Sequence, residues 1–232
     1  MLLSDRLKSI LRGPVPLSAA SPAVTDMGRP RIAAGSGKNE ILRTRASRGL
    51  EQFVGSLREL SGLAILDLGG ANQENVNFIT SLGHKFYSED FLRIFQEIFA
   101  GDRADQSNPS RIEYFLGQVL DYPDEQFDGV MAWDLLEYME PALLSAAIDR
   151  LARILKPKGY LLAFFHSDDH MDTVPCYSFR IEDPRNLQVC EYGNRAPSQL
   201  FNNRRLEKLF QKFESVKFFL TRECLREVIV RK

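Results

Sequence analysis

The segment "ILDLGGANQENVNF", from Ile65 to Phe78, carries residue types that can hold a cofactor containing a nucleoside. Asp67 ends an apolar run, and Gly69 and Gly70 follow it. Glycine suits such a loop because a ligand can approach the backbone closely where no Cβ is in the way. The G-x-G-x-x-G pattern of dinucleotide sites is incomplete, however, and an acid falls in the first turn of the next helix, where it would repel a pyrophosphate. These residues disfavour a dinucleotide oxidoreductase.

A cofactor without phosphate groups removes these objections. S-adenosylmethionine is a nucleoside joined to an amino acid, and its sulfonium is a cation that an acid such as Asp67 does not repel. We therefore predict that Gly69, Gly70 and Asn72 form part of a binding site for S-adenosylmethionine.

The segments that position this loop alternate between short apolar runs and amphipathic stretches, which indicates an α/β fold with a doubly wound, mostly parallel sheet. The expected strands are residues 63–68, 84–88, 111–117, 127–133 and 160–166, and the expected helices are residues 42–60, 73–83, 90–101 and 141–155. Towards the C-terminus we expect a hairpin across 177–192, a helix over 202–213 and an antiparallel pair of strands at 215–220 and 226–230. Ligands of such sheets bind beyond the carboxyl ends of the strands, where the glycine loop is expected.

Three motifs make a family resemblance specific. From about Leu63 to Lys232 the chain resembles the class I S-adenosylmethionine-dependent methyltransferases, especially the small-molecule branch with enzymes of ubiquinone and menaquinone biosynthesis. "ILDLGG" is similar to their Asp-x-Gly-x-Gly motif, "GQVLDYPDEQFDGVMAWDLLEYM" to a stretch ending in D-x-L-E-H, and "LARILKPKGYLL" to their L-K-P-G-G segment. The resemblance implies a Rossmann-like sheet of seven strands and S-adenosylmethionine as cofactor.

The same resemblance implies roles for single residues. Asp90, next to Glu89, falls at the position of the acid that binds the ribose, and Gln118 at that of the acid that contacts adenine. Asp67 would orient the methionine end of the cofactor, and Trp133 would pack against it. Each assignment has an alternative: Asp67 and Asp90 are also typical capping residues, and Trp133 is also a typical core residue.

The chain departs from the family pattern at several positions. Ala71 replaces the second loop glycine, Asn72 or Gln73 the third, Tyr138 the motif histidine, and Lys158 a turn glycine. These changes keep a second hypothesis open, in which a non-catalytic protein of the same fold binds or regulates without turnover.

A base is needed for methyl transfer only where the acceptor must lose a proton. The segment "HSDDHMD" follows the last parallel strand and offers His166 and His170 as candidate bases. A polar loop without a role is the alternative interpretation. We expect no metal site here, although imidazole and carboxylate are possible ligands.

The composition sets the remaining expectations. Net charge is −1, which argues against a specific nucleic-acid binder, and no apolar run reaches the length of a membrane span or a secretory signal. Residues 1–38 form a basic, largely flexible extension that could touch an acidic partner or surface weakly, whereas 39–232 form the methyltransferase-like domain. Three cysteines without paired spacing indicate reduced thiols and a cytoplasmic protein.

We thus predict an enzyme that methylates an oxygen or carbon of a small-molecule acceptor, whose identity the sequence does not reveal. The hairpin within 173–197 is expected to wall the acceptor pocket, through Tyr177, Phe179 and Tyr192, with Arg180 and Arg185 available to an acidic or phenolic acceptor. The alternative is a hairpin without a role in binding, or one that forms a dimer contact.

Overall fold

The computed structural model describes residues 42–99, 105–167, 172–221 and 225–232. The chain divides into two units, Met1–Lys38 and Asn39–Lys232, and every described residue belongs to the second. The expected basic extension and His170 therefore lie outside the described residues. Within the described ranges, no helix is both long and apolar enough to cross a membrane.

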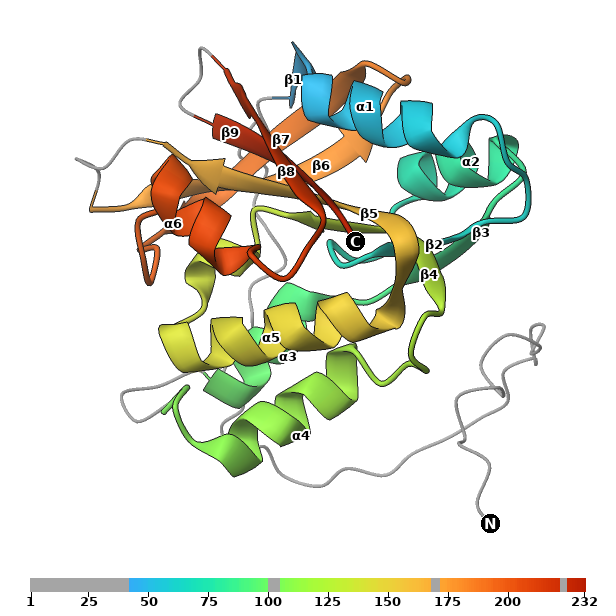
Figure 1. Ribbon diagram of the computed structural model, residues 1–232. Coiled ribbons are helices and arrows are strands. Elements are labelled where there is room, and N and C mark those ends of the chain that lie inside the picture. Colours follow the sequence, from blue (N-terminus) through green and yellow to red (C-terminus); the bar gives the residue numbers. More distant parts are fainter. Residues whose placement is uncertain (1–41, 100–104, 168–171, 222–224) are drawn as a thin grey trace, which may run out of the picture. The chain divides into compact units, whose positions relative to one another are not determined.

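The main sheet has six strands in the order β3-β2-β4-β5-β9-β8 (Figure 1). Its strands are β2 (Ala64–Asp67), β3 (Lys85–Ser88), β4 (Phe127–Trp133), β5 (Leu155–His166), β8 (Ser215–Leu220) and β9 (Leu225–Arg231). Neighbours from β3 to β5 are parallel, whereas β9 runs antiparallel to both β5 and β8. The predicted Rossmann-like α/β fold with an antiparallel C-terminal pair is confirmed. Strand order reverses between β2 and β4, which is where such sheets bind ligands.

The prediction of seven strands is wrong for the described residues, because residues 111–117 are helical. They belong to α4 (Pro109–Val119), which begins after Asn108, whose Oδ1 accepts hydrogen bonds from two backbone N–H groups of the first turn (3.0 and 3.3 Å). Phe115 and Val119 then fall on one helical face and are fully buried. A short apolar run does not distinguish strand from helix by its period, so the cap and the proline were the informative signals.

Alternate side chains of the sheet face two separate cores. On one face lie α3 (Phe91–Phe99), α4, α5 (Pro141–Ile154) and α6 (Asn203–Leu209), and on the other lie α1 (Arg48–Leu57) and α2 (Gln73–Ser81) (Figure 1). A short 3-10 helix, η2 (Leu136–Tyr138), connects β4 to α5. Because both faces are covered, the central strand β4 is buried at six of its seven positions and does not alternate with exposed polar residues.

A second, antiparallel sheet adds to the core beside α1 and α2. Its order is β1 (Leu42–Ala46), β7 (Asn186–Arg195) and β6 (Val174–Ile181), and β6 and β7 form the predicted hairpin. Residues 42–46 are thus extended, which corrects the expected helix over 42–60. That helix begins only after Ser47, its N-cap residue, whose Oγ accepts from the Leu50 N–H (3.0 Å). An N-cap residue has extended backbone geometry, so the residues before it are not helical.

One buried ion pair joins the second sheet to the main sheet. Arg45 of β1 donates from Nη2 to Glu227 Oε1 of β9 at 2.7 Å, and their side chains are 6% and 0% exposed. Glu227 Oε2 accepts from the Gly49 N–H at 2.6 Å, so the carboxylate also lies at the N-terminus of α1. A buried carboxylate needs such partners because its transfer from water is costly.

Arg45→Met should remove this partner and lower the free energy of unfolding by about 3–5 kcal/mol, because Glu227 would stay buried with one donor fewer. Arg153→Met is the matched control, since Arg153 pairs with Asp124 at 3.0 Å on the surface, with side chains 61% and 55% exposed. That change should cost less than about 1 kcal/mol. Urea unfolding of both variants measures the difference, and equal losses would contradict the assigned role of the buried pair.

Candidate functional site

A cavity of about 350 Å³ opens at the carboxyl ends of the parallel strands, where strand order reverses. Its wall brings together residues that are far apart in the chain, from the glycine loop, the ends of β3 and β4, and the hairpin. Five of the predicted cofactor-binding residues line it, namely Gly69, Gly70, Asn72, Asp90 and Trp133. Asp67, Glu89 and Gln118 are not among its lining residues.

The glycine loop is shaped for a close approach of its backbone. Gly70 has φ +85°, which favours glycine, and its N–H donates to the carbonyl of Glu89 at 3.1 Å. A Cβ at Gly70 would lie 3.7 Å from the carboxyl carbon of Asp90. Asn72 ends the loop as the N-cap of α2, with Oδ1 accepting from the Asn75 N–H at 2.8 Å.

The buried side chain of Asp67 is hydrogen-bonded to the glycine loop. Its carboxylate is fully buried and accepts from the Gly69 N–H (2.8 Å), the indole Nε1–H of Trp133 (2.6 Å) and the amide Nδ2 of Asn75 (2.8 Å). Burial raises its pKa to about 6, although the three donors favour the ionised form. The capping role weighed for this residue is therefore present, and direct contact with a cofactor stays a prediction.

Trp133 ends β4 in a strained backbone conformation. Its φ of +48° is unfavourable for a bulky side chain, and such strain persists only where the surroundings enforce it. The ring stacks on Phe179 of β6, with centroids 5.1 Å apart and planes 9° apart. It also packs on Gly69, where a Cβ would come within 2.7 Å of the indole Cδ1. Trp133 is therefore a core residue that also lines the cavity, and its packing against a cofactor stays a prediction.

The structure adds Asn75, which the sequence analysis missed. Besides contacting Asp67, its Nδ2 donates to the carbonyl of Phe179 (3.2 Å), and its Oδ1 accepts from the Ile181 N–H (2.7 Å). Asn75 thereby joins the loop, α2 and β6. A polar residue on the buried face of a helix breaks the apolar period, and that is the one sequence signal that it offers.

The two acids after β3 have different surroundings. The side chain of Asp90 is 49% exposed at the cavity, and its Oδ1 also caps α3 by accepting from the Arg93 N–H at 3.2 Å. Glu89 instead accepts from the hydroxyl of Tyr122 at 2.6 Å. Asp90 is therefore the acid that faces the cavity.

A second group of ionisable residues lies beside the cavity, at the ends of β4 and β5. Asp134 lines the cavity and is 3% exposed. Glu137 of η2 accepts from the backbone N–H of His166 at 2.9 Å and lies 2.5 Å from its Nδ1. Because a carboxylate only accepts, Nδ1 carries the hydrogen. Burial and the nearby charge of Glu137 raise the pKa of Asp134 to about 7.

This group changes which residue is the best candidate base. His166, a predicted base, does not line the cavity of the glycine loop, whereas Asp134 does. The ring of His166 stacks at 6.0 Å on Tyr177, which lines that cavity. Asp134 and Glu137 stand in the "DLLEYM" motif directly after β4, so their place at the sheet edge was available from the sequence. Within the described ranges, no three His, Cys, Asp or Glu side chains gather as metal ligands do.

The hairpin contributes to both the cavity and the core. Tyr177, Phe179, Arg180 and Tyr192 line the cavity, while Arg185 pairs with Glu51 at 2.8 Å on the surface and does not. The core beside α1 includes four hairpin side chains, those of Phe179, Ile181, Leu187 and Val189. The hairpin is consequently part of the domain's core as well as a wall.

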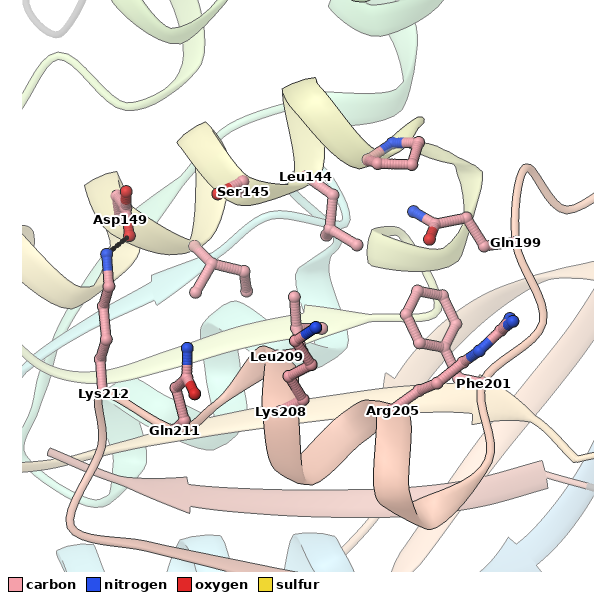
Figure 2. Close-up of a pocket in the computed structure, with 12 residues that line it drawn as sticks. Leu144, Ser145, Asp149, Gln199, Phe201, Arg205, Lys208, Leu209, Gln211 and Lys212 are labelled. Atoms are coloured by element: carbon pink, nitrogen blue, oxygen red, sulfur yellow. Dashed lines mark hydrogen bonds and ion pairs between the residues drawn. The ribbon is translucent and has the colours of Figure 1, made fainter.

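A larger cavity of about 490 Å³ lies elsewhere, between α5 and α6 (Figure 2). Leu144 of α5 and Leu209 of α6 point towards each other across it, and Lys212 pairs with Asp149 at its edge (2.5 Å). None of the predicted cofactor-binding residues lines it. The smaller cavity is the better candidate, since the glycine loop and the carboxylates are there.

Comparison with known proteins found one matching family and a number of similar solved structures. The family described as "Methyltransferase domain" matches residues 39–214. A SAM-dependent methyltransferase from Archaeoglobus fulgidus is 16% identical, with a TM-score of 0.47 over 79% of this chain and 91% of that one. The 1,6-didemethyltoxoflavin-N1-methyltransferase of Burkholderia thailandensis is 11% identical, with a TM-score of 0.43 over 80% and 78%. No curated protein sequence matches significantly.

The raised pKa of Asp134 predicts a pH-dependent stability. With a pKa of about 7 in the folded chain against 3.8, the contribution of this group is fully present below pH 3.8 and is lost as the pH rises through 7. The Asp134→Asn variant has no carboxyl group to titrate, so it should not lose this stability as the pH rises. The free energy of unfolding of the variant minus that of the parent should therefore increase by roughly 2–3 kcal/mol between pH 5 and pH 8. Asp67 titrates equally in both proteins and cancels.

Thermal unfolding of both proteins at the two pH values measures this difference. A constant difference would show that Asp134 is not protonated in the folded protein near neutral pH.

Proposed function

This chain belongs to the methyltransferase-domain family, and we propose that it transfers the methyl group of S-adenosylmethionine to an oxygen or carbon of a small molecule. Family membership confirms the predictions of a methyltransferase and of its cofactor, whereas the acceptor and the methylated atom are the proposal. The observation that carries it is the placement of Asp134 in the same cavity as the glycine loop and Asp90.

The residues of the cavity fit the cofactor. Gly70 leaves the backbone uncovered next to the carboxylate of Asp90, which can accept two hydroxyl hydrogen bonds from a ribose. The volume of about 350 Å³ is within the range of small-molecule sites. Gly69, Gly70, Asn72 and Asp90 would hold the cofactor, with Trp133 against it.

The bound cofactor supplies a methyl group already activated by a sulfonium, so the protein's share of catalysis is largely positioning. Asp134 is the residue that we propose to accept the proton from the methyl acceptor. Its pKa of about 7 leaves a large fraction ionised near neutral pH, and a base works best when its pKa is close to the working pH. It can take the proton from a hydroxyl, or from a carbon made acidic by a neighbouring carbonyl group. This favours O- or C-methylation over methylation of a neutral amine, which needs no base beforehand.

His166 and Glu137 support Asp134 in this proposal. The charge of Glu137 raises the pKa of Asp134, and His166 opposes that effect. Glu137 also fixes the imidazole through Nδ1 and the backbone N–H. Glu137 and His166 therefore adjust the pKa of Asp134 in opposite directions, and Glu137 fixes His166 at the end of β5.

One observation favours a second candidate function, a binding protein of this fold that has lost turnover. The indole of Trp133 packs directly on Gly69, which narrows the approach to the loop. Binding and turnover measured separately distinguish the two functions.

Binding of the cofactor can be followed directly, because Trp133 is the only tryptophan of the chain and lines the cavity. Titration with S-adenosylmethionine or its demethylated product should change its fluorescence. Asp90→Asn should keep the cap of α3, since Asn and Asp cap equally well, yet weaken binding at least tenfold, or about 1.4 kcal/mol. Unchanged affinity in this variant would leave Asp90 as a cap alone.

Turnover tests the role of Asp134. Incubation of a metabolite extract with S-adenosylmethionine carrying a deuterated methyl group should label an acceptor, which mass spectrometry identifies. For that acceptor, Asp134→Asn should lower kcat by roughly 100-fold or more, and the parent's kcat/KM should rise with pH through about 7. Cofactor affinity should stay within about threefold, under 1 kcal/mol. A variant with full activity would exclude Asp134 as the base.

A further inference from the structure

A second cavity of about 350 Å³ lies on the other side of His166. It is lined by His166 and Ser167 after β5, by Phe201 and Asn202 before α6, and by two arginines, Arg205 of α6 and Arg226 of β9. Among the described residues that line it there are two guanidinium groups and no carboxylate.

Arg226 is buried, and among the described residues it has no partner of opposite charge. It is 8% exposed, its Nη1 donates to the carbonyl of Phe201 at 2.5 Å, and its Nε has no hydrogen-bond partner among the described residues. Burial lowers its pKa, and no carboxylate in the described ranges opposes that shift. Arg45 provides the contrast. It is also 8% exposed, but it is paired with a carboxylate, that of Glu227, the next residue of β9.

His166 adds a second buried atom that lacks a partner. It is 5% exposed, Glu137 occupies its Nδ1 side, and its Nε2 has no hydrogen-bond partner in the described part of the chain. Arg205 contributes a second cation from α6, held by a bond from Nη1 to the carbonyl of Leu200 at 2.8 Å. Arg226 and His166 therefore leave polar atoms unsatisfied beside one cavity.

Groups of this kind are costly to bury unless a ligand pairs with them. An isolated buried charge is strongly unfavourable, whereas a carboxylate or phosphate satisfies guanidinium groups with paired, charge-assisted hydrogen bonds. The guanidinium groups of Arg226 and Arg205 therefore call for an anionic oxygen group as the ligand of this cavity.

We propose that this cavity binds a carboxylate or phosphate group of the methyl acceptor, so that the acceptor is an anionic molecule reaching from Arg226 to Asp134. The proposal rests on the proposed function for the acceptor's reaction. The two cavities are neighbours, because the ring of His166, which lines this cavity, stacks on that of Tyr177, which lines the cavity of the glycine loop.

The anion site can be tested on the full chain without cofactor or acceptor. Inorganic phosphate, titrated at constant ionic strength against chloride, is the probe, with calorimetry and thermal shift as readouts. Phosphate should bind and raise the melting temperature. Arg226→Met should weaken phosphate binding at least tenfold while melting no lower than the parent, because the variant loses a buried unpaired charge.

Asn202→Asp is a second variant that should preserve the fold. Asn202 caps α6 by accepting from the Arg205 N–H at 2.9 Å, and Asp caps as well as Asn. The new carboxylate would supply the missing partner of the arginines, so phosphate binding should again fall at least tenfold. Arg153→Met, on the surface beside Asp124, is the matched control and should bind phosphate within twofold of the parent. Phosphate affinity that is absent from the parent, or unchanged in both cavity variants, overturns the proposal.

The labelled acceptor then shows whether the anion that binds in this cavity is a group of the acceptor or a separate ion such as phosphate. It should be retained by an anion-exchange resin, and Arg226→Met should raise its KM at least tenfold while fluorescence of Trp133 reports unchanged cofactor affinity. A neutral acceptor, or an unchanged KM, overturns the assignment of the site to the acceptor. Failure of the proposed function would be visible separately, as loss of cofactor binding or of all labelling in the parent.

Discussion

The buried carboxylate of Asp67 is the constraint on which the site depends. It lies at the end of a central strand without access to water, so its oxygens must be satisfied by the protein. The donors come from the glycine loop, from α2 through Asn75 and from β4 through Trp133. Asn75 extends the same network to the backbone of β6. One acid thus determines the path of the loop, the strained conformation of Trp133 and the position of the hairpin.

Neighbouring strands show how surroundings separate the roles of two similar acids. Asp67 ends β2 and Asp134 directly follows the adjacent strand β4. Both are buried, and burial raises their pKa values to about 6 and about 7. Asp67 accepts from three donors and is not among the residues that line the cavity. Asp134 lies near the negative charge of Glu137 and lines the cavity, which leaves its proton available for chemistry. Different surroundings commonly divide carboxylates between such tasks.

The hairpin links the stability of the domain to the shape of its site. Phe179 stacks on Trp133 and is also part of the core beside α1, while its backbone carbonyl binds Asn75. The second sheet is in turn joined to β9 by Arg45 and Glu227. A change in the packing of either sheet is therefore expected to move the wall of the cavity.

The sequence by itself determined the fold class, the order of most elements and the edge of the sheet at which the candidate site lies. Those features follow from local signals, such as the period of apolar residues, helix caps, and glycines after strands, and Gly70 and Asp90 were placed correctly at the cavity by that logic. Only the tertiary structure decided that Asp67 is buried among three donors, that Glu137 contacts His166, and that Arg226 has no described acid as a partner. The reason is physical: pairing and burial depend on residues that are distant in the chain, and no local period records them.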